Sequence, residues 1–191
     1  MVAHLASFEV PAAEATNGAT QGITLSLYIN AQRLISHSQC AGNRRHTMRT
    51  KLKEVSGIDW FDGAVMNCSW TGPLLCDVLK KASLKVSKEE YANAHVAFAC
   101  FQTPTQEDKW YGASVPLSRI MNPESGIILA LQMNGKPLSP NHGAPVRVVT
   151  PGIAGARSVK WLDKVTVQMS ESDNFYQRYF KLLPTIFSFR T

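Results

Sequence analysis

The stretch HGAPVRVVTPGIAGARSVKW, residues 142–161, joins a short apolar run to glycine-bearing turns and four basic side chains. The run VRVVTP at 146–151 predicts a buried strand, because β-branched residues dominate it. Glycine turns let backbone N–H groups approach a phosphate, while arginine clamps it and lysine adds a point charge. The stretch therefore predicts a site for an anionic cofactor, with candidate residues His142, Arg147, Arg157 and Lys160. The ordinary alternative is that His142 caps a loop while Arg157 and Lys160 are solvated.

Apolar runs on both sides of this stretch predict further strands. They are GITLSLYIN at 22–30, HVAFACF at 95–101, GIILALQM at 126–133 and VKWLDKVTVQM at 159–169. The first alternates apolar and polar residues, and the next two are typical of buried strands. The pair Asn134-Gly135 predicts a tight turn directly after the third run.

Two segments predict short helices between these strands. In WTGPLLCDVLKKAS at 70–83, Thr71 can cap a helix, Pro73 suits its first turn, and lysines end it. Its apolar stripe consists of Leu74, Leu75, Val78, Leu79 and Ala82. The segment PLSRIMN at 116–122 predicts the second helix. A β-rich chain with short helices belongs to the α+β class.

Composition limits the possible classes of function but does not identify one. The chain has 191 residues with 45% hydrophobic content, and 20 Lys and Arg against 14 Asp and Glu give a net charge of +6. These values suit one domain with anionic partners. We expect no nucleic-acid partner, because zinc-finger spacing and RNA-binding aromatic motifs are missing. We also expect no membrane span and no targeting signal.

The cysteines predict a reducing compartment and one candidate metal ligand. Cys40, Cys68, Cys76 and Cys100 form no CxxC pair. Molybdenum or tungsten favours soft sulfur donors, and a thiolate near cations and backbone N–H groups provides one. In SQCAGNRRHTM at 38–48, Cys40 precedes two arginines and fits this description. The alternative is a buried structural cysteine, which is the role we expect of the other three.

Several long motifs in one order carry a family resemblance. They are CAGNRR at 40–45, WTGPLLCDVL at 70–79, YGASVPLSRIMNPE at 111–124, LALQMNGKPLSPNHGAPVRVVTPGIAGARSVKWL at 129–162 and ESDNFYQR at 171–178. Together they resemble the molybdenum-cofactor domain of the sulfite oxidase and assimilatory nitrate reductase family, over roughly residues 20–182. The resemblance implies a β-rich molybdopterin-binding fold and a molybdenum–molybdopterin cofactor.

The resemblance also implies roles for individual residues. Cys40 becomes the protein thiolate on molybdenum, Arg45 holds the substrate oxyanion, and Trp60 lines the substrate pocket. The positions that contact the pterin are Gln102, His142, Arg147, Ser158, Val159 and Lys160. Gln102 replaces an aspartate of the family, and an amide can still form hydrogen bonds there. Tyr179 lies near the place of a catalytic tyrosine, although the spacing differs. Tyr111 could line the pocket, but an aromatic residue packed before a helix is the simpler interpretation.

The implied activity is oxygen-atom transfer to or from a small inorganic anion, with oxidation of sulfite to sulfate favoured. A nitrate reductase-type domain and a non-catalytic remnant that binds only the cofactor are the alternatives. An external cytochrome or haem domain would carry electrons, since no haem-binding HPGG motif occurs. Family members form homodimers and are expected in the cytoplasm or mitochondria.

The resemblance divides the chain into three parts. Residues 1–21 are expected to be a flexible leader, and 22–182 the cofactor domain without the family's upstream segment like FTRNH. Residues 183–191 are expected to be an irregular tail, with the family's dimerisation domain absent from this sequence.

Overall fold

The computed structural model describes residues 4–9, 31–51, 54, 57–82, 84, 86–102 and 104–182. The strand predicted at 22–30, most of the predicted leader and the predicted tail at 183–191 lie outside the described residues. Strand β1 (His4–Glu9) falls within the segment expected to be a leader and pairs with β10 (Lys164–Gln168). This part of the leader segment therefore belongs to a sheet.

The first sheet is antiparallel and packs against the larger hydrophobic core. Its strand order is β1, β10, β4 (His95–Cys100) and β5 (Tyr111–Pro116). In β4 every second side chain is buried, as the predicted strand at 95–101 requires. The strand predicted at 159–169 is shorter, since β10 covers only its last part.

The second sheet contains β2 (Ala31–Gln39), β3 (Val65–Pro73), β7 (Gln132–Met133) and β8 (Lys136–Pro137). A two-stranded sheet pairs β6 (Ile128–Ala130) with β9 (Arg147–Val149), the latter within the strand predicted at 146–151. Asn134 and Gly135 have positive φ values of 53° and 75° in the β7–β8 hairpin, which confirms the predicted turn.

The prediction of a single strand at 126–133 is wrong in one respect, because the structure splits this segment between two sheets. Its first half, β6, pairs with β9, and its second half, β7, pairs with β3. Between them, Leu131 donates its backbone N–H to the carbonyl of Thr71, at 2.8 Å, and buries its side chain in the core. The chain changes partner at this residue.

The helix predicted from Thr71 begins later than expected. Thr71 and Pro73 lie in β3, and helix α3 (Leu75–Lys81) follows Leu74, which provides no side-chain cap. Pairing of this segment with neighbouring strands overrides the local capping signal of Thr71. The packing is close here, since Gly72 lies directly against the backbone of Leu129. The predicted apolar stripe is buried at Leu75 and Leu79.

The remaining helices are short. The predicted second helix is α5 (Leu117–Ile120). Helix α4 (Lys88–Asn93) starts with a capping box formed by Ser87 and Glu90, and α6 (Phe175–Leu182) packs against β5. The described part of the chain also contains three short 3₁₀ turns: η1 (Pro123–Ser125), η2 (Pro140–His142) and η3 (Gly155–Arg157). The α+β prediction is confirmed by these sheets and short helices.

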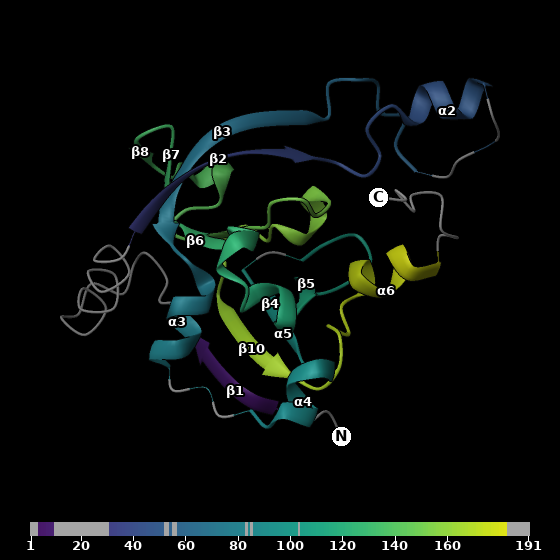
Figure 1. The fold of residues 1–191 in the computed structure, drawn as a ribbon. Helices are drawn as coiled ribbons and strands as arrows, with labels where there is room; N and C mark the ends of the chain where they lie inside the picture. The colour runs from purple at the N-terminus through teal and green to yellow at the C-terminus, as the bar shows by residue number, and fades with distance from the viewer. Residues whose placement is uncertain are drawn as a thin grey trace.

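Strands β2 and β3 form a long ribbon that runs toward helix α2 (Arg45–Lys51), as Figure 1 shows. We call residues 40–51 and 57–64 the hairpin tip. Its two halves are joined by backbone hydrogen bonds, among them Cys40 N to Ala64 O at 2.9 Å and His46 N to Trp60 O at 3.0 Å. Within the described part of the chain, no helix is long and apolar enough to cross a bilayer.

Candidate functional site

A cavity of about 450 Å³ lies where β5, η2, η3 and the segment after η3 meet. Four of the residues that the sequence predicted to bind the cofactor line it, namely His142, Arg147, Ser158 and Lys160. Tyr111, Asn141 and Trp161 line it as well. The fold therefore brings His142, Arg147 and Lys160 of the 142–161 stretch to one hollow, whereas Arg157, the fourth predicted basic residue, is not among the residues that line it.

Arg147 is the most deeply buried charged residue of the cavity wall, with 5% of its surface exposed. Its Nη1 donates to the carbonyl of His142 and its Nη2 to that of Ser158, each at 3.1 Å. The guanidinium also lies 4.9 Å from the centroid of the Trp70 ring. Burial lowers its pKa to about 10, so the side chain stays charged at neutral pH. Arg147 thus ties two cavity segments together and adds positive charge.

Lys160 and Trp161 form the next part of the wall. Lys160 Nζ donates to the carbonyl of Asn141 at 3.0 Å and lies 4.2 Å from the centroid of the Trp161 ring. Burial lowers the pKa of Lys160, and the positive charge of Arg147 lowers it further. Trp161 has a positive φ of 51°, which is unusual for a bulky residue, and donates its indole N–H to Pro140 O at 2.7 Å.

His142 and Ser158 are placed by neighbouring hydroxyl groups. His142 Nδ1 lies 2.7 Å from Ser139 Oγ, so the side chain closes the η2 turn as well as lining the cavity. Ser158 Oγ accepts the backbone N–H of Thr150 at 3.1 Å and lies 2.9 Å from its hydroxyl. These bonds fix the backbone on both sides of the hollow.

Tyr111 lines the cavity from strand β5, which leads directly into α5, and it also packs against the core, so the two sequence interpretations of this residue both hold. Its hydroxyl donates to Ala156 O at 2.6 Å. Burial raises the pKa of this hydroxyl; Arg157 opposes the rise, while negative charge on Tyr176 and Cys40 adds to it.

Cys40 follows the end of β2 and is exposed. Its Sγ accepts the backbone N–H of Gly42 at 3.4 Å. Gly155 of the cavity wall lies against the end of β2, because a Cβ on it would stand 2.9 Å from Ser38 Oγ and 3.1 Å from Gln39 O. Cys40 thus directly follows a segment that contacts the cavity wall, although it is not itself among the residues that line the cavity. Because it is exposed, the expectation of a buried structural cysteine does not apply to it.

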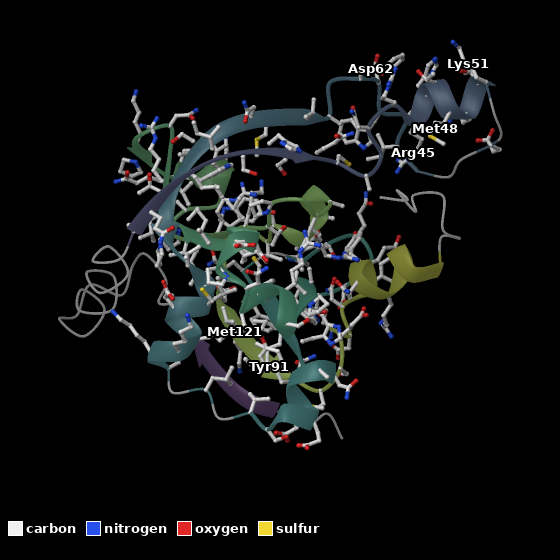
Figure 2. The ribbon with its side chains drawn as sticks, viewed as in Figure 1. Arg45, Met48, Lys51, Asp62, Tyr91 and Met121 are labelled. Carbon is white, nitrogen blue, oxygen red and sulfur yellow. The ribbon has the colours of Figure 1, made fainter. Side chains whose placement is uncertain are left out.

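Arg45 and Trp60 lie together in the hairpin tip and are not among the residues that line the cavity. Arg45 Nη1 donates to Ile58 O at 2.6 Å, and both Arg45 and the half-exposed Trp60 contact Gly42. Figure 2 shows Arg45 at the tip with Lys51 and Asp62, away from Tyr91 and Met121 in the body. The tip lies on the Cys40 side of the cavity.

Three predicted residues lie elsewhere. Gln102 is exposed and donates to Asp163 Oδ1 at 2.7 Å, outside the residues that line the cavity. The side chain of Val159 is fully buried in the core, on the side opposite to its neighbours Ser158 and Lys160, which line the cavity. Tyr179 belongs to the backbone of α6, but its side chain lies outside the described residues.

The wall residue that sequence reasoning missed is Trp161. Its signal was its place beside Lys160 in the glycine-bearing stretch, where an aromatic ring can pack on a lysine. Its positive φ could not be read from the sequence. Among the described residues, no three His, Cys, Asp or Glu side chains gather as a metal site.

The residues of the cavity fit the phosphorylated pterin that the resemblance implies. The described residues that line it include Arg147 and Lys160, aromatic rings and hydroxyl groups, but no Asp or Glu. Such a wall suits a flat anionic molecule, and a volume of about 450 Å³ lies in the usual range for small ligands. The exposed thiol of Cys40, which follows the segment packed against Gly155, adds a soft donor for a metal.

Comparisons with known proteins agree with this chemistry. The family model described as "Oxidoreductase molybdopterin binding domain" matches residues 24–176. A sulfite oxidase, mitochondrial, of Macaca fascicularis is 52% identical over 141 residues, which are 73% of this chain and 25% of that protein. A nitrate reductase [NADPH] of Fusarium oxysporum is 37% identical over 151 residues, which are 78% of this chain and 16% of that protein.

The fold has a counterpart among solved structures. The sulfane dehydrogenase SoxCD of Paracoccus pantotrophus matches with a TM-score of 0.54 and 24% identity, over 75% of this chain and 33% of that one. This likeness concerns the fold alone. The chain spans about a quarter of the length of the sulfite oxidase it matches.

Proposed function

The chain belongs to the oxidoreductase molybdopterin-binding domain family, and we propose that it holds a mono-pterin molybdenum cofactor and oxidises sulfite to sulfate. The observation that carries the proposal is the cationic cavity, against whose wall the segment directly before the exposed Cys40 is packed. In this proposal Cys40 provides the protein sulfur on the metal. Arg147 and Lys160 neutralise the phosphate of the pterin, and His142 and Ser158 bind its polar edges.

When bound, the cofactor supplies oxygen-atom transfer and accepts the two electrons that sulfite releases. The residues of the chain bind and orient. Arg45 attracts the sulfite anion to the Cys40 side of the cavity, and Trp60 shields that place from water. Arg45 would attract nitrate as well, so charge does not separate the two substrates. The higher identity to a sulfite oxidase, 52% against 37% for a nitrate reductase, supports sulfite.

Partners and compartment follow from the same proposal. Electrons leave to an external carrier, either a cytochrome or a haem domain, and the chain acts within a homodimer. The mitochondrial name of the macaque relative supports a mitochondrial site of action. We further propose that residues 22–182 are the cofactor-binding unit, and that Gln102, Val159 and Tyr179 contribute to it, Val159 through its backbone.

The test is to purify the chain from a host that makes the cofactor and measure molybdenum per chain. Sulfite oxidation is then followed with an electron acceptor, and nitrate reduction with a reduced dye. We expect about one molybdenum per chain and sulfite turnover. Turnover of nitrate but not of sulfite would mean that nitrate is the substrate. Bound molybdenum without turnover of either anion would favour a domain that only binds the cofactor.

The role of Cys40 has its own test. In Cys40→Ser a hydroxyl replaces the soft thiolate, so we expect sulfite turnover to fall at least about 100-fold while the pterin stays bound. Pterin content is measured by its fluorescence after release. Cys68→Ser is the control variant, because Cys68 is buried in the core of the second sheet. Full activity in Cys40→Ser would exclude Cys40 as the metal ligand.

A further inference from the structure

The guanidinium group of Arg45 lies in a slot between two glycines of the hairpin tip. A Cβ on Gly42 would stand 2.6 Å from Arg45 Nη2, and a Cβ on Gly57 would stand 2.6 Å from Arg45 Nη1. Both distances are far shorter than van der Waals contact. The planar guanidinium of Arg45 therefore occupies the space that the Cβ of any other residue at position 42 or 57 would need.

The slot has a fixed end and a fixed side wall. Arg45 Nη1 donates to Ile58 O at 2.6 Å, which sets the depth of the guanidinium. Trp60 Cδ1 would lie 2.8 Å from a Cβ on Gly42, so the indole closes one side. Gly57 has a positive φ of 111°, a backbone conformation that side chains disfavour.

Gly42 connects this slot to the thiol. Its backbone N–H donates to Cys40 Sγ at 3.4 Å, while its Cα faces Arg45 Nη2. One residue thus contacts both the sulfur and the guanidinium. A change in its bulk would alter the placement of the cation relative to the sulfur.

We infer that Gly42 and Gly57 are positioning residues that set where Arg45 holds the substrate anion. The inference rests on the proposed function, because it takes Arg45 as the anion-binding side chain. A Cβ at Gly42 meets the far end of the Arg45 side chain and the edge of the Trp60 indole, and none of its three nearest atoms belongs to the backbone. Alanine there displaces the guanidinium more than it disturbs the fold.

The first test is sulfate binding to the cofactor-loaded chain, measured by calorimetry, for Gly42→Ala. We expect about tenfold weaker binding, with molybdenum content and melting temperature unchanged, because the cation no longer aligns with the anion. Gly63→Ala is the matched control, since Gly63 lies in the same tip and a Cβ on it has no atom within 4 Å. Equal sulfate affinity in Gly42→Ala and the unaltered chain would overturn the role of Gly42.

Gly57→Ala tests the other face of the slot. We again expect about tenfold weaker sulfate binding. Its positive φ adds backbone strain, so Gly135→Ala is the control: Gly135 has a φ of 75°, and a Cβ on it has no neighbour within 4 Å. Equal sulfate affinity in Gly57→Ala and the unaltered chain would overturn the role of Gly57.

A double variant separates positioning from general disturbance. If Gly42 acts through Arg45, then Gly42→Ala adds no further loss of sulfate affinity when Arg45 is already alanine. Additive losses would overturn the inference. If Arg45→Ala alone leaves sulfate binding and the KM for sulfite unchanged, the anion-binding role in the proposed function fails too. If Arg45→Ala weakens binding but both glycine variants do not, only the slot fails.

Discussion

The cavity wall and the hairpin tip both present arginines, but they hold them in different ways. Arg147 in the wall is 5% exposed and donates to backbone carbonyls of two segments. In the tip, Arg44 and Arg49 pair with the carboxylates of Asp62 and Asp59 at 3.3 and 3.0 Å, and α2 has no buried residue. The wall is held by contacts with the core, whereas the tip is held by backbone hydrogen bonds between its two halves and by ion pairs near the surface.

This difference separates stability from binding. A change in the wall removes hydrogen bonds that water cannot replace, so it costs folding free energy. A change in the tip breaks interactions that solvent screens, so it costs little folding free energy and acts mainly on what the tip binds. The following variants test whether the wall and the tip differ in this way.

Arg147→Ala should have the largest effect. The carbonyls of His142 and Ser158 lose their donor in a buried place, and we expect the free energy of unfolding to fall by about 3 kcal/mol. Urea unfolding measures it. Arg45→Ala in the tip should cost less than about 1 kcal/mol. Equal losses for the two arginines would remove the distinction between wall and tip.

Ser158→Ala should have a smaller effect at the same wall. It leaves the buried backbone N–H of Thr150 without its acceptor, and we expect a loss of about 1 to 2 kcal/mol in urea unfolding. The exposed Ser118 on α5 provides the control, since Ser118→Ala should change stability by less than about 0.5 kcal/mol. A neutral Ser158→Ala would mean that water reaches this part of the wall.

Asp59→Asn tests the main ion-pair cluster of the tip. Asp59 Oδ2 accepts from Arg49 Nη2 at 3.0 Å and lies 2.7 Å from His46 Nδ1, with its side chain 32% exposed. We expect a loss of about 0.5 to 1 kcal/mol that shrinks at high salt. Asp62→Asn, at 71% exposure, should be near neutral. A loss above that of Ser158→Ala would show that the tip is as firmly built as the wall.

The smallest effect concerns the pH dependence of anion binding at the wall. The pKa of Lys160 is lowered from 10.5, so its ammonium loses its proton at a lower pH than a free lysine does. As pH rises through this lowered pKa the cavity loses positive charge, and its affinity for an anion falls. Glycerol phosphate, already doubly charged well above its pKa of about 6, is a suitable probe.

We expect glycerol phosphate to bind about two- to fivefold more weakly at alkaline pH, measured by calorimetry on the cofactor-free chain. Lys160→Gln should bind weakly at neutral pH and show less dependence on alkaline pH. The Lys136→Gln variant, in the exposed β7–β8 hairpin, should behave as the unaltered chain. Affinity that is constant up to pH values near 10.5 would contradict the lowered pKa.

Local sequence patterns predicted many of the strands and turns outside the hairpin tip. Alternating burial in 95–100 follows from the HVAFAC pattern, and the Asn134-Gly135 turn follows from the ease with which both residues take positive φ. Local sequence failed at Thr71, where a good capping residue lies in a strand. There the pairing of β3 with β2 and β7 supplies more hydrogen bonds than a helix start would.

Residue types in a fixed order are enough to identify the family and the basic character of the 142–161 stretch, and they predict Cys40 as the metal ligand. Only the tertiary structure decided that Tyr111 and Trp161 share the cavity wall. It alone decided that Gln102 pairs with Asp163 and that two glycines flank Arg45. These contacts join residues distant in the chain or depend on backbone angles, and neither is set by local propensity.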